Sequence, residues 1–414
     1  MKTESQTRRR RIIGTDLHPD SFSAVQVTGN EISQLKKERL FTKLPTAMWE
    51  HFVTKQIPEE SIIVCEAGSN SFELMRIARQ AGHQTVVLNS VSAGQIAKAY
   101  CKNDPKDAFR AAKLYVCGLA EGIWEPDEET QLKREILSAY ICAKKDYTRM
   151  SNRLKSFLCE HGIREKKKLL KRDGILEKIK QKYNWTPEQL FLLERMFDDL
   201  EYTVQQRERF HRMIGKSVLA NPEMAKLMRL CGIRLIAAYA LLAQIGDIER
   251  FRNPKSLVAY LGLAPCVHAS GNHQQQGGMQ KGGTTQVKAI LIQAAHSILK
   301  SKNKSGERLR KWGISLGMRR GKVVAAGAVA RKLAVACWYA LKGFPPEILE
   351  EEIEIKAKLK KIATELKTPL IRSIGYEKVG DFVEEYTYLI LTRSSEAVER
   401  WKNLQKTVFS TLCT

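Results

Sequence analysis

The stretch Lys102-Asn103-Asp104-Pro105-Lys106-Asp107-Ala108 predicts the start of a helix. Proline suits the first helical position because it has no N–H to lose there, so we expect Asp104 at the N-cap and Asp107 in the first turn. Two interpretations fit these carboxylates. They can satisfy unpaired amides and the helix dipole. Alternatively, they can be two of four carboxylates that hold a divalent metal, and the rest of the chain has to decide.

The residues before this stretch predict strands and helices that end on further acids. Residues 11–16 give a short strand ending on Asp16, and residues 61–66 give a continuous apolar strand ending on Glu66. The other predicted elements are strands at 23–27, 31–41 and 84–88, and helices at 45–56, 71–81 and from the opening stretch to about 118. The order β-β-β-α-β-α-β-α is similar to that of the ribonuclease-H/RuvC-like fold, in which carboxylates gather at one edge of the sheet.

Chemistry explains why Asp16, Glu66, Asp104 and Asp107 would converge. Like charges about 4 Å apart repel by roughly 4 kcal/mol at an effective dielectric near 20, so an unpaired cluster is unfavourable. Two Mg²⁺ ions remove that cost and can clamp the attacking and leaving oxygens of a phosphodiester. The pattern therefore favours the metal interpretation over plain helix capping.

The charge of the chain indicates a polyanionic partner. Its 414 residues include 69 Lys and Arg against 45 Asp and Glu, a formal net charge of +24. Nucleic acid is the common partner for such an excess. A membrane surface is disfavoured, because the sequence has no run of 18 apolar residues and no recognisable signal peptide. The nine cysteines include no C-x-x-C pair, which disfavours a zinc site or a disulfide framework and predicts reducing cytoplasm.

The middle of the chain predicts two long helices. Apolar residues recur at three- and four-residue steps from Asp127 to about His161. Thr186-Pro187-Glu188-Gln189 is a capping box that opens a second helix to about Lys216. Together with the basic segment 164–172, they predict an antiparallel, coiled-coil-like hairpin. Dimerisation, nucleic-acid contact and a plain helical spacer are all compatible with it.

The last part of the chain predicts further helices around one unusual segment. Residues 227–245 are similar to half of a helix-hairpin-helix, whose turn lets backbone amides meet a phosphate, although Arg234 replaces the usual second glycine. Residues 266–284 are rich in Gly and Gln without apolar periodicity and predict a long loop, which is usually functional or disordered. A basic zone at 308–322, an Ala-rich helix at 323–341 and a charged, mostly helical tail follow.

These residues together resemble the DEDD transposases of the insertion-sequence-110 class, the bridge-RNA-guided recombinases. The resemblance covers roughly residues 10–345. It rests on seven motifs in the same order: Gly14-Thr15-Asp16, Glu66-Ala67-Gly68, the opening stretch 102–108, Leu230-Cys231-Gly232-Ile233, Ile245-Gly246-Asp247-Ile248-Glu249-Arg250-Phe251, Ala259-Tyr260-Leu261-Gly262-Leu263-Ala264-Pro265 and Ser270-Gly271.

The resemblance implies a catalytic site in two parts. Asp16, Glu66, Asp104 and Asp107 would form the Mg²⁺-binding catalytic tetrad, and Ser270 would be the nucleophile that takes the DNA strand as a phosphoserine. Such a division is chemically sensible, since a serine hydroxyl needs activation and the cleaved phosphodiester needs its charge neutralised. Without the resemblance, Ser270 is simply one hydroxyl in a flexible loop.

The resemblance also implies partners and a four-part organisation. The partners would be donor and target DNA, a structured noncoding RNA and further copies of the chain in a dimer or tetramer, in a prokaryotic cytoplasm. We expect an α/β plus all-α chain: a RuvC-like DEDD domain at 1–125, a long helical hairpin at 126–218, a helical transposase domain with the serine loop at 219–345 and a helical extension at 346–414.

Three functions compete for this sequence. The first is a site-specific DNA recombinase that uses both the tetrad and Ser270. The second is a metal-dependent nuclease, similar to a Holliday-junction resolvase, in which the serine loop only grips DNA. The third is a nonenzymatic nucleic-acid-binding protein with a decayed fold, which the presence of all four acids disfavours.

Overall fold

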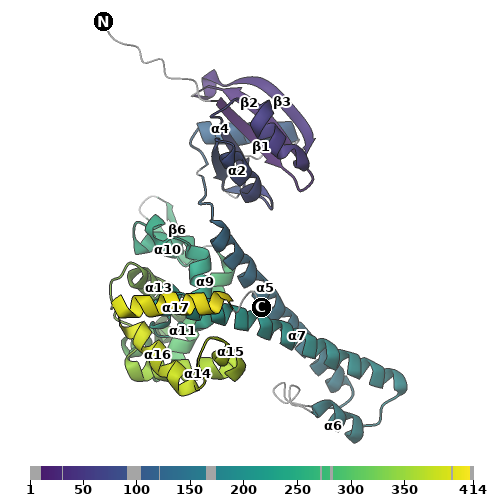
Figure 1. Ribbon diagram of the computed structural model, residues 1–414, viewed down its shortest axis with the longest axis vertical. Coiled ribbons are helices and arrows are strands. Elements are labelled where there is room, and N and C mark those ends of the chain that lie inside the picture. The colour runs from purple at the N-terminus through teal and green to yellow at the C-terminus, as the bar shows by residue number, and fades with distance from the viewer. Residues whose placement is uncertain are drawn as a thin grey trace. The chain divides into compact units, whose positions relative to one another are not determined.

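The computed structural model describes residues 11–29, 31–90, 104–120, 122–164, 174–270, 273–279, 283–392 and 395–410. The chain divides into two compact units, Met1–Pro126 and Asp127–Thr414. The first is a mixed α/β unit, and the second is mostly helical (Figure 1). Both agree with the predicted fold class at this level.

The first unit is built on a five-stranded sheet in the order β3-β2-β1-β4-β5. The strands are β1 (Arg11–Leu17), β2 (Ser21–Thr28), β3 (Lys36–Pro45), β4 (Ile62–Glu66) and β5 (Gln84–Leu88). β1 pairs antiparallel with β2 and parallel with β4, and β4 pairs parallel with β5. The carboxyl ends of β1, β4 and β5 therefore meet at one edge of the sheet.

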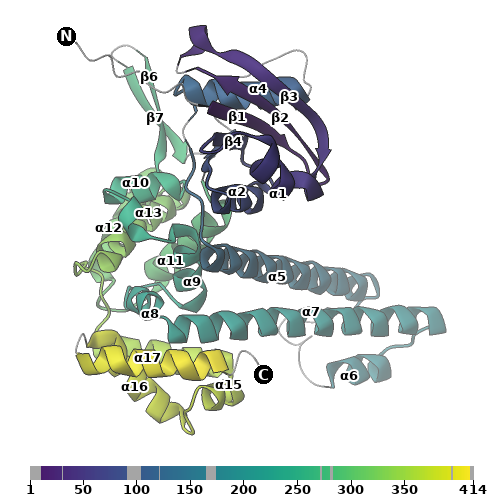
Figure 2. The same cartoon turned by 45° about the horizontal axis from the view of Figure 1, so that its top comes forward.

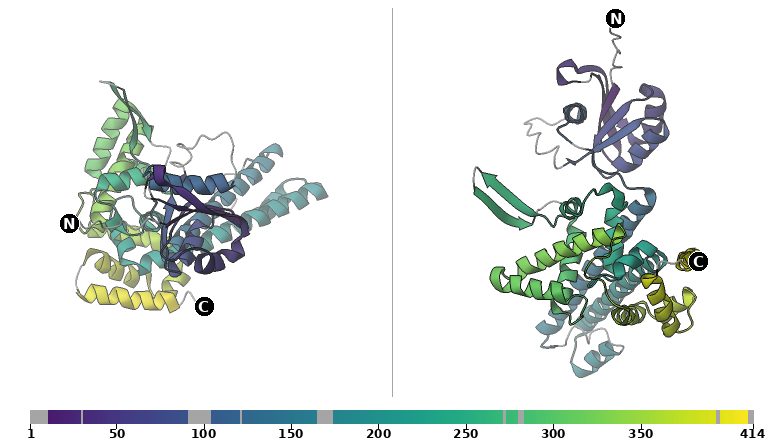
Figure 3. Two further views of the ribbon diagram at one scale, coloured as in Figure 1. Left: turned by 90° about the horizontal axis from the view of Figure 1, so that it is seen from above. Right: turned by 90° about the vertical axis from the view of Figure 1, so that its left-hand side faces the viewer.

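Helices cover both faces of this sheet (Figure 3). On one face, α1 (Trp49–His51), the following segment Phe52–Gln56 and α2 (Ser71–Gln80) pack Trp49, Phe52 and Met75 against the strands. On the other face, α4 (Asp104–Val116) packs three alanines and Leu114 against the opposite side chains of the same strands. Burial on both faces explains the continuous apolar runs of β1 and β4.

Two predicted elements of this unit have other bounds or forms. The third strand begins at Lys36 rather than residue 31, because Ile32–Gln34 form a 3-10 turn closed by the Gln34 amide on the Glu31 carbonyl. The predicted helix at 45–56 is a 3-10 turn (Thr46–Met48), α1 and a π-helical segment (Phe52–Gln56) in succession. The other predicted strands and helices are present to within a few residues.

The second unit begins with the predicted antiparallel hairpin of long helices (Figure 2). α5 (Glu128–Glu160) is capped by Asp127, and α7 (Pro187–Ala220) opens with the predicted capping box. Leu154 and Leu158 of α5 pack with Leu193 and Leu200 of α7. A short helix that was not predicted, α6 (Ile175–Lys182), contributes Ile179 to the same cluster.

Helices and one β-hairpin complete the second unit. The next helices are α8 (Pro222–Met228), α9 (Leu235–Ile245), α10 (Pro254–Tyr260), α11 (Thr285–Lys300), α12 (Glu307–Arg320) and α13 (Lys322–Leu341). The prediction of a long loop at residues 266–284 is wrong, since β6 (Pro265–Ser270) and β7 (His273–Met279) pair as an antiparallel hairpin. The two strands form a sheet of their own that extends from the helices in Figure 3.

The C-terminal segment joins the core of this unit. Its helices are α14 (Glu352–Leu366), α15 (Thr368–Ser373), α16 (Val379–Leu391) and α17 (Ser395–Ser410). Leu359, Phe382 and Tyr386 belong to the same cluster of buried residues as α8, α9 and α13. Among the described helices, α13 is long and apolar enough to cross a membrane, but 61% of its apolar 18-residue stretch is buried inside the protein.

Candidate active site

Two parallel strands carry the first two predicted acids to one edge of the sheet. The register of β1 and β4 pairs Thr15 with Cys65, so the next residues, Asp16 and Glu66, come to the same edge. The buried Thr15 hydroxyl donates a hydrogen bond to the Val64 carbonyl at 3.0 Å. This bond fixes the two strands to each other one residue before the acids.

A glycine lets the helix that carries the other two acids approach this edge. A Cβ at Gly14 of β1 would collide with the carbonyl oxygen of Ala108 and crowd Ala112 in α4. α4 therefore lies directly on β1, and its first turn, with Asp104 and Asp107, reaches the strand ends. Asp104 is the first helical residue rather than the predicted N-cap, because the helix begins one position earlier than expected.

Two side chains, the His18 imidazole and the Arg110 guanidinium, divide the four carboxylates into pairs. The His18 Nε2 atom lies 3.4 Å from Asp16 Oδ2 and 3.9 Å from Asp104 Oδ1. The Arg110 guanidinium lies 2.7 Å from Asp107 Oδ1 through Nη1 and 3.3 Å from Glu66 Oε1 through Nη2. The four predicted acids thus come to one sheet edge, Asp16 and Asp104 beside His18, and Glu66 and Asp107 beside Arg110.

The electrostatics of Asp16 reflect this crowding. Burial raises the pKa of the Asp16 carboxyl, His18 lowers it, and the charges of Asp107, Asp104 and Glu66 raise it further. Three neighbouring carboxylates thus raise the pKa of Asp16, and one neighbour, His18, lowers it. Ligand atoms of Asp16, His18 and Asp104 also lie within 4.8 Å of one another, as they would around one metal ion. A surplus of carboxylate oxygens fits a hard divalent cation such as Mg²⁺.

His18 and Arg110 were not predicted from the sequence. Arg110 stands three residues after Asp107 on a helix, a spacing that brings side chains together, so this signal was available. His18 lies just past the end of β1, where no periodicity directs a side chain. Its position follows from the turn into β2, in which the His18 amide donates to the Ser21 carbonyl.

The other predicted catalytic residue, Ser270, belongs to the second unit. It is the last residue of β6, and the hairpin register pairs it with His273 of β7. Side-chain contacts at 267–270 and 273–276, including those of His268, lie outside the described part of the chain. The serine is therefore placed by its backbone, at the end of a hairpin strand.

Two family models match the chain. One, described as "Transposase IS116/IS110/IS902 family", matches residues 224–311, which include Ser270. The other, a transposase model for the DEDD class of IS110, matches residues 13–163, which include all four acids. The chain belongs to the IS110 family of transposases. The family resemblance inferred from the seven motifs is thereby confirmed.

Relatives of this IS110-family chain come from several bacteria. The y4qE protein of Sinorhizobium fredii is 27% identical over 242 residues, 57% of this chain and 58% of its own length. The "Transposase for insertion sequence element IS1111A" of Coxiella burnetii is 24% identical over 58% of this chain and 66% of its own. The "Transposase for insertion sequence element IS1328" of Yersinia enterocolitica is 24% identical, with 67% and 82% covered. The match thus covers less than two thirds of the length of the y4qE protein and of the IS1111A transposase.

Proposed function

We propose that this chain is a transposase that cleaves and rejoins DNA strands during transposition. The observation that carries the proposal is the convergence of Asp16, Glu66, Asp104 and Asp107 on one sheet edge, beside His18 and Arg110. Membership of a transposase family and the net charge of +24 support a DNA substrate.

The four carboxylates would hold Mg²⁺, which prefers oxygen ligands. When bound, this metal neutralises the charge that develops on a phosphodiester and polarises its oxygens. In the metal-free protein, the Arg110 guanidinium offsets part of the repulsion between Glu66 and Asp107. Gly14 and the Thr15 hydrogen bond hold the acids at the sheet edge whether or not metal is present.

The finer proposal is a covalent serine intermediate. The Ser270 hydroxyl oxygen would attack phosphorus, forming a phosphoserine ester as the bond from phosphorus to a deoxyribose oxygen breaks. The serine loses its proton and the leaving deoxyribose oxygen gains one, so the step needs no co-reactant. Attack by a strand-end hydroxyl on the phosphoserine reverses the step, which permits religation without ATP.

Partners complete the proposal. Donor and target DNA would be the substrates, and a structured noncoding RNA would guide the choice of site, as the family resemblance implies. Base pairing would then read sequence, while the basic protein binds backbone and shape. The α5–α7 hairpin offers long helical surfaces for association into a dimer or tetramer, which would let the tetrad of one copy meet Ser270 of another.

A metal-dependent nuclease without a covalent intermediate is the alternative, and one pair of variants separates the two. Ser270→Ala is expected to abolish a covalent protein–DNA adduct on denaturing gels, with Ser315→Ala on the exposed side of α12 as the control. Full strand exchange by Ser270→Ala would overturn the serine mechanism, and cleavage by this variant without an adduct or rejoining would favour the nuclease. Asp104→Asn is expected to remove cleavage under either mechanism, with Glu73→Gln on α2 as the control. Retained cleavage in Asp104→Asn would overturn the metal site.

A further inference from the structure

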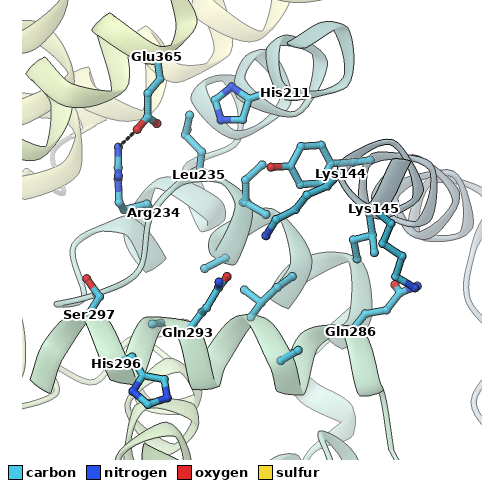
Figure 4. Close-up of a pocket in the computed structure, with 18 of the residues that line it drawn as sticks. Lys144, Lys145, His211, Arg234, Leu235, Gln286, Gln293, His296, Ser297 and Glu365 are labelled. Carbon is cyan, nitrogen blue, oxygen red and sulfur yellow. Dashed lines mark hydrogen bonds and ion pairs between the residues drawn. The ribbon is translucent and has the colours of Figure 1, made fainter. Parts of the chain in front are cut away.

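The helical unit contains a basic groove that the proposed reaction does not use. It has a volume of about 920 Å³ and lies between α5, α9 and α11 (Figure 4). Lys144 and Lys145 line it from α5, and Gln286, Gln293 and Lys300 line it from α11. In Figure 4 the Lys144 side chain extends from α5 toward the space between α9 and α11. We call this feature the α5–α11 groove.

Its charge is positive and largely uncompensated. Lys144, Lys145 and Lys300 make no ion pair within the part of the chain that the structure describes. The one carboxylate in the lining, Glu365, is already paired with Arg234 at 2.6 Å. Burial lowers the pKa of His211 at the upper end of the groove, so that this residue stays neutral at pH 7 and the lysines carry the charge. The groove therefore suits an anion.

Backbone amides add to the lysines. Helix α9 starts in the groove wall, where Leu235 and Ile236 line the cavity. Its N-cap residue, Arg234, provides no side-chain cap, and its side chain is directed to Glu365 instead. Gly232, with a φ of +81°, turns the chain into this helix. Unpaired amides at a helix start favour anions, so they strengthen a site that the lysines define.

The shape and lining of the groove indicate an unpaired strand. Its volume is in the range that buries a small ligand or a few connected groups, so it can hold a short part of one strand. Apolar side chains, Ile141, Ile236 and Ile290, line it between the lysines and glutamines. Such a surface contacts bases and sugars, which a duplex keeps inside, while lysines bind the phosphates.

We propose that the α5–α11 groove binds the phosphodiester backbone of an unpaired nucleic-acid strand. The inference rests on the proposed function only in that the protein handles nucleic acid. It requires neither the metal tetrad nor Ser270. The strand can be DNA or RNA, since the two share the charged backbone that the lysines recognise.

The test measures binding of a labelled single strand of about 15 nucleotides, as DNA or as RNA, in EDTA so that no cleavage occurs. Lys144→Gln with Lys145→Gln is expected to weaken binding on the order of tenfold at 0.1 M salt, because each phosphate contact contributes about −0.7 to the log–log salt slope. The slope should fall by about 1.4. Ala289→Glu, which places an acid on the groove wall without removing a lysine, should weaken binding as well.

The matched control is Arg153→Gln with Lys155→Gln, which removes the same charge from exposed positions farther along α5. Equal losses in both double variants would mean diffuse charge attraction and would overturn the groove, as would unchanged binding in the groove variants. A loss confined to duplex probes would also overturn it. Because binding is measured in EDTA, a failure of the metal site leaves this result interpretable.

Discussion

The acidic edge of the first unit and the α5–α11 groove of the second carry charges of opposite sign and differ in how far those charges are paired. At the acidic edge, each carboxylate pair has a nitrogen-bearing side chain beside it, the His18 imidazole or the Arg110 guanidinium, before any ligand arrives. In the groove, three lysines have no such partner among the described residues, and the one acid is committed to Arg234. The carboxylates of the first region are thus held beside these side chains before a metal binds. The second region carries an unbalanced positive charge that attracts a polyanion.

The two regions also differ in what holds them in place. A close backbone approach at Gly14 supports the acidic edge. A buried ion pair supports the turn before the groove: Lys358 Nζ lies 2.5 Å from the Glu350 carboxylate and donates to the carbonyls of Met228, Leu230 and Ile233 at 2.6–3.0 Å. Burial raises the pKa of Glu350 and lowers that of Lys358, and each charge opposes the shift of the other. A substitution that removes one support should therefore leave ligand binding by the other region unchanged.

The largest expected effect is on the groove. Lys358→Met leaves the buried Glu350 without its cation and three carbonyls without a donor, which should cost about 3–5 kcal/mol of stability. Hydrogen exchange of α8 and α9 should accelerate, and single-strand binding should weaken, while Mg²⁺ binding persists. Lys358→Met with Glu350→Gln should recover part of the loss, since no charge is then left unpaired. Equal stability of Lys358→Met and the natural chain would contradict this role.

The next effect concerns the acidic edge. Gly14→Ala places a Cβ against backbone of α4 and should cost about 3 kcal/mol, because the carbonyl of Ala108 has no room to move. Calorimetry should show Mg²⁺ binding weakened and single-strand binding unchanged. Gly68→Ala, where a Cβ meets open space, is the matched control. Normal Mg²⁺ affinity in a stably folded Gly14→Ala protein would break the link between close approach and site geometry.

The third effect depends on pH. Because the pKa of Asp16 is raised, its contribution to metal-free stability is full below the unfolded pKa near 3.8 and is lost as pH rises through the folded pKa. Mg²⁺ competes with that proton, so its stabilisation should grow over the same rise in pH, to about 2.7 kcal/mol at 100 times Kd. Thermal melts with and without Mg²⁺ from pH 4 to pH 7 test this sign. Asp16→Asn should remove both the pH slope and most of the Mg²⁺ effect.

The smallest effect concerns Arg110, the cation beside Glu66 and Asp107. Arg110→Gln removes the cation shared by Glu66 and Asp107 and should destabilise the metal-free protein by about 1 kcal/mol. Since less positive charge then opposes the metal, Mg²⁺ should restore more stability to this variant than to the natural chain. Thermal melts at fixed pH measure both. Arg195→Gln, from an exposed pair on α7, should change neither.

Sequence patterns predicted the acidic edge far better than the groove. Asp16 and Glu66 end strands, and Asp107 follows a helix start, so periodicity and capping rules place them at one edge. The α5–α11 groove takes residues from Tyr140 to Glu365, on helices whose packing no local pattern specifies. Helix α9, Leu235–Ile245, lies within the predicted helical segment 227–245, but its role as a groove wall depends on α5 and α11. The β6–β7 hairpin was not predicted because its segment is rich in Gly and Gln and lacks the apolar alternation that identifies a strand.

The ion pair of Lys358 has a consequence for synthesis of the protein. Lys358 is 125 residues beyond Ile233, whose carbonyl it caps. At about 5–20 residues per second, a ribosome needs roughly 6–25 s to supply that lysine after the turn has been made. The acidic edge, complete by Arg110, has all its parts well before then. A nascent or prematurely terminated chain would thus carry the acids without a finished groove, which separates the two regions in time.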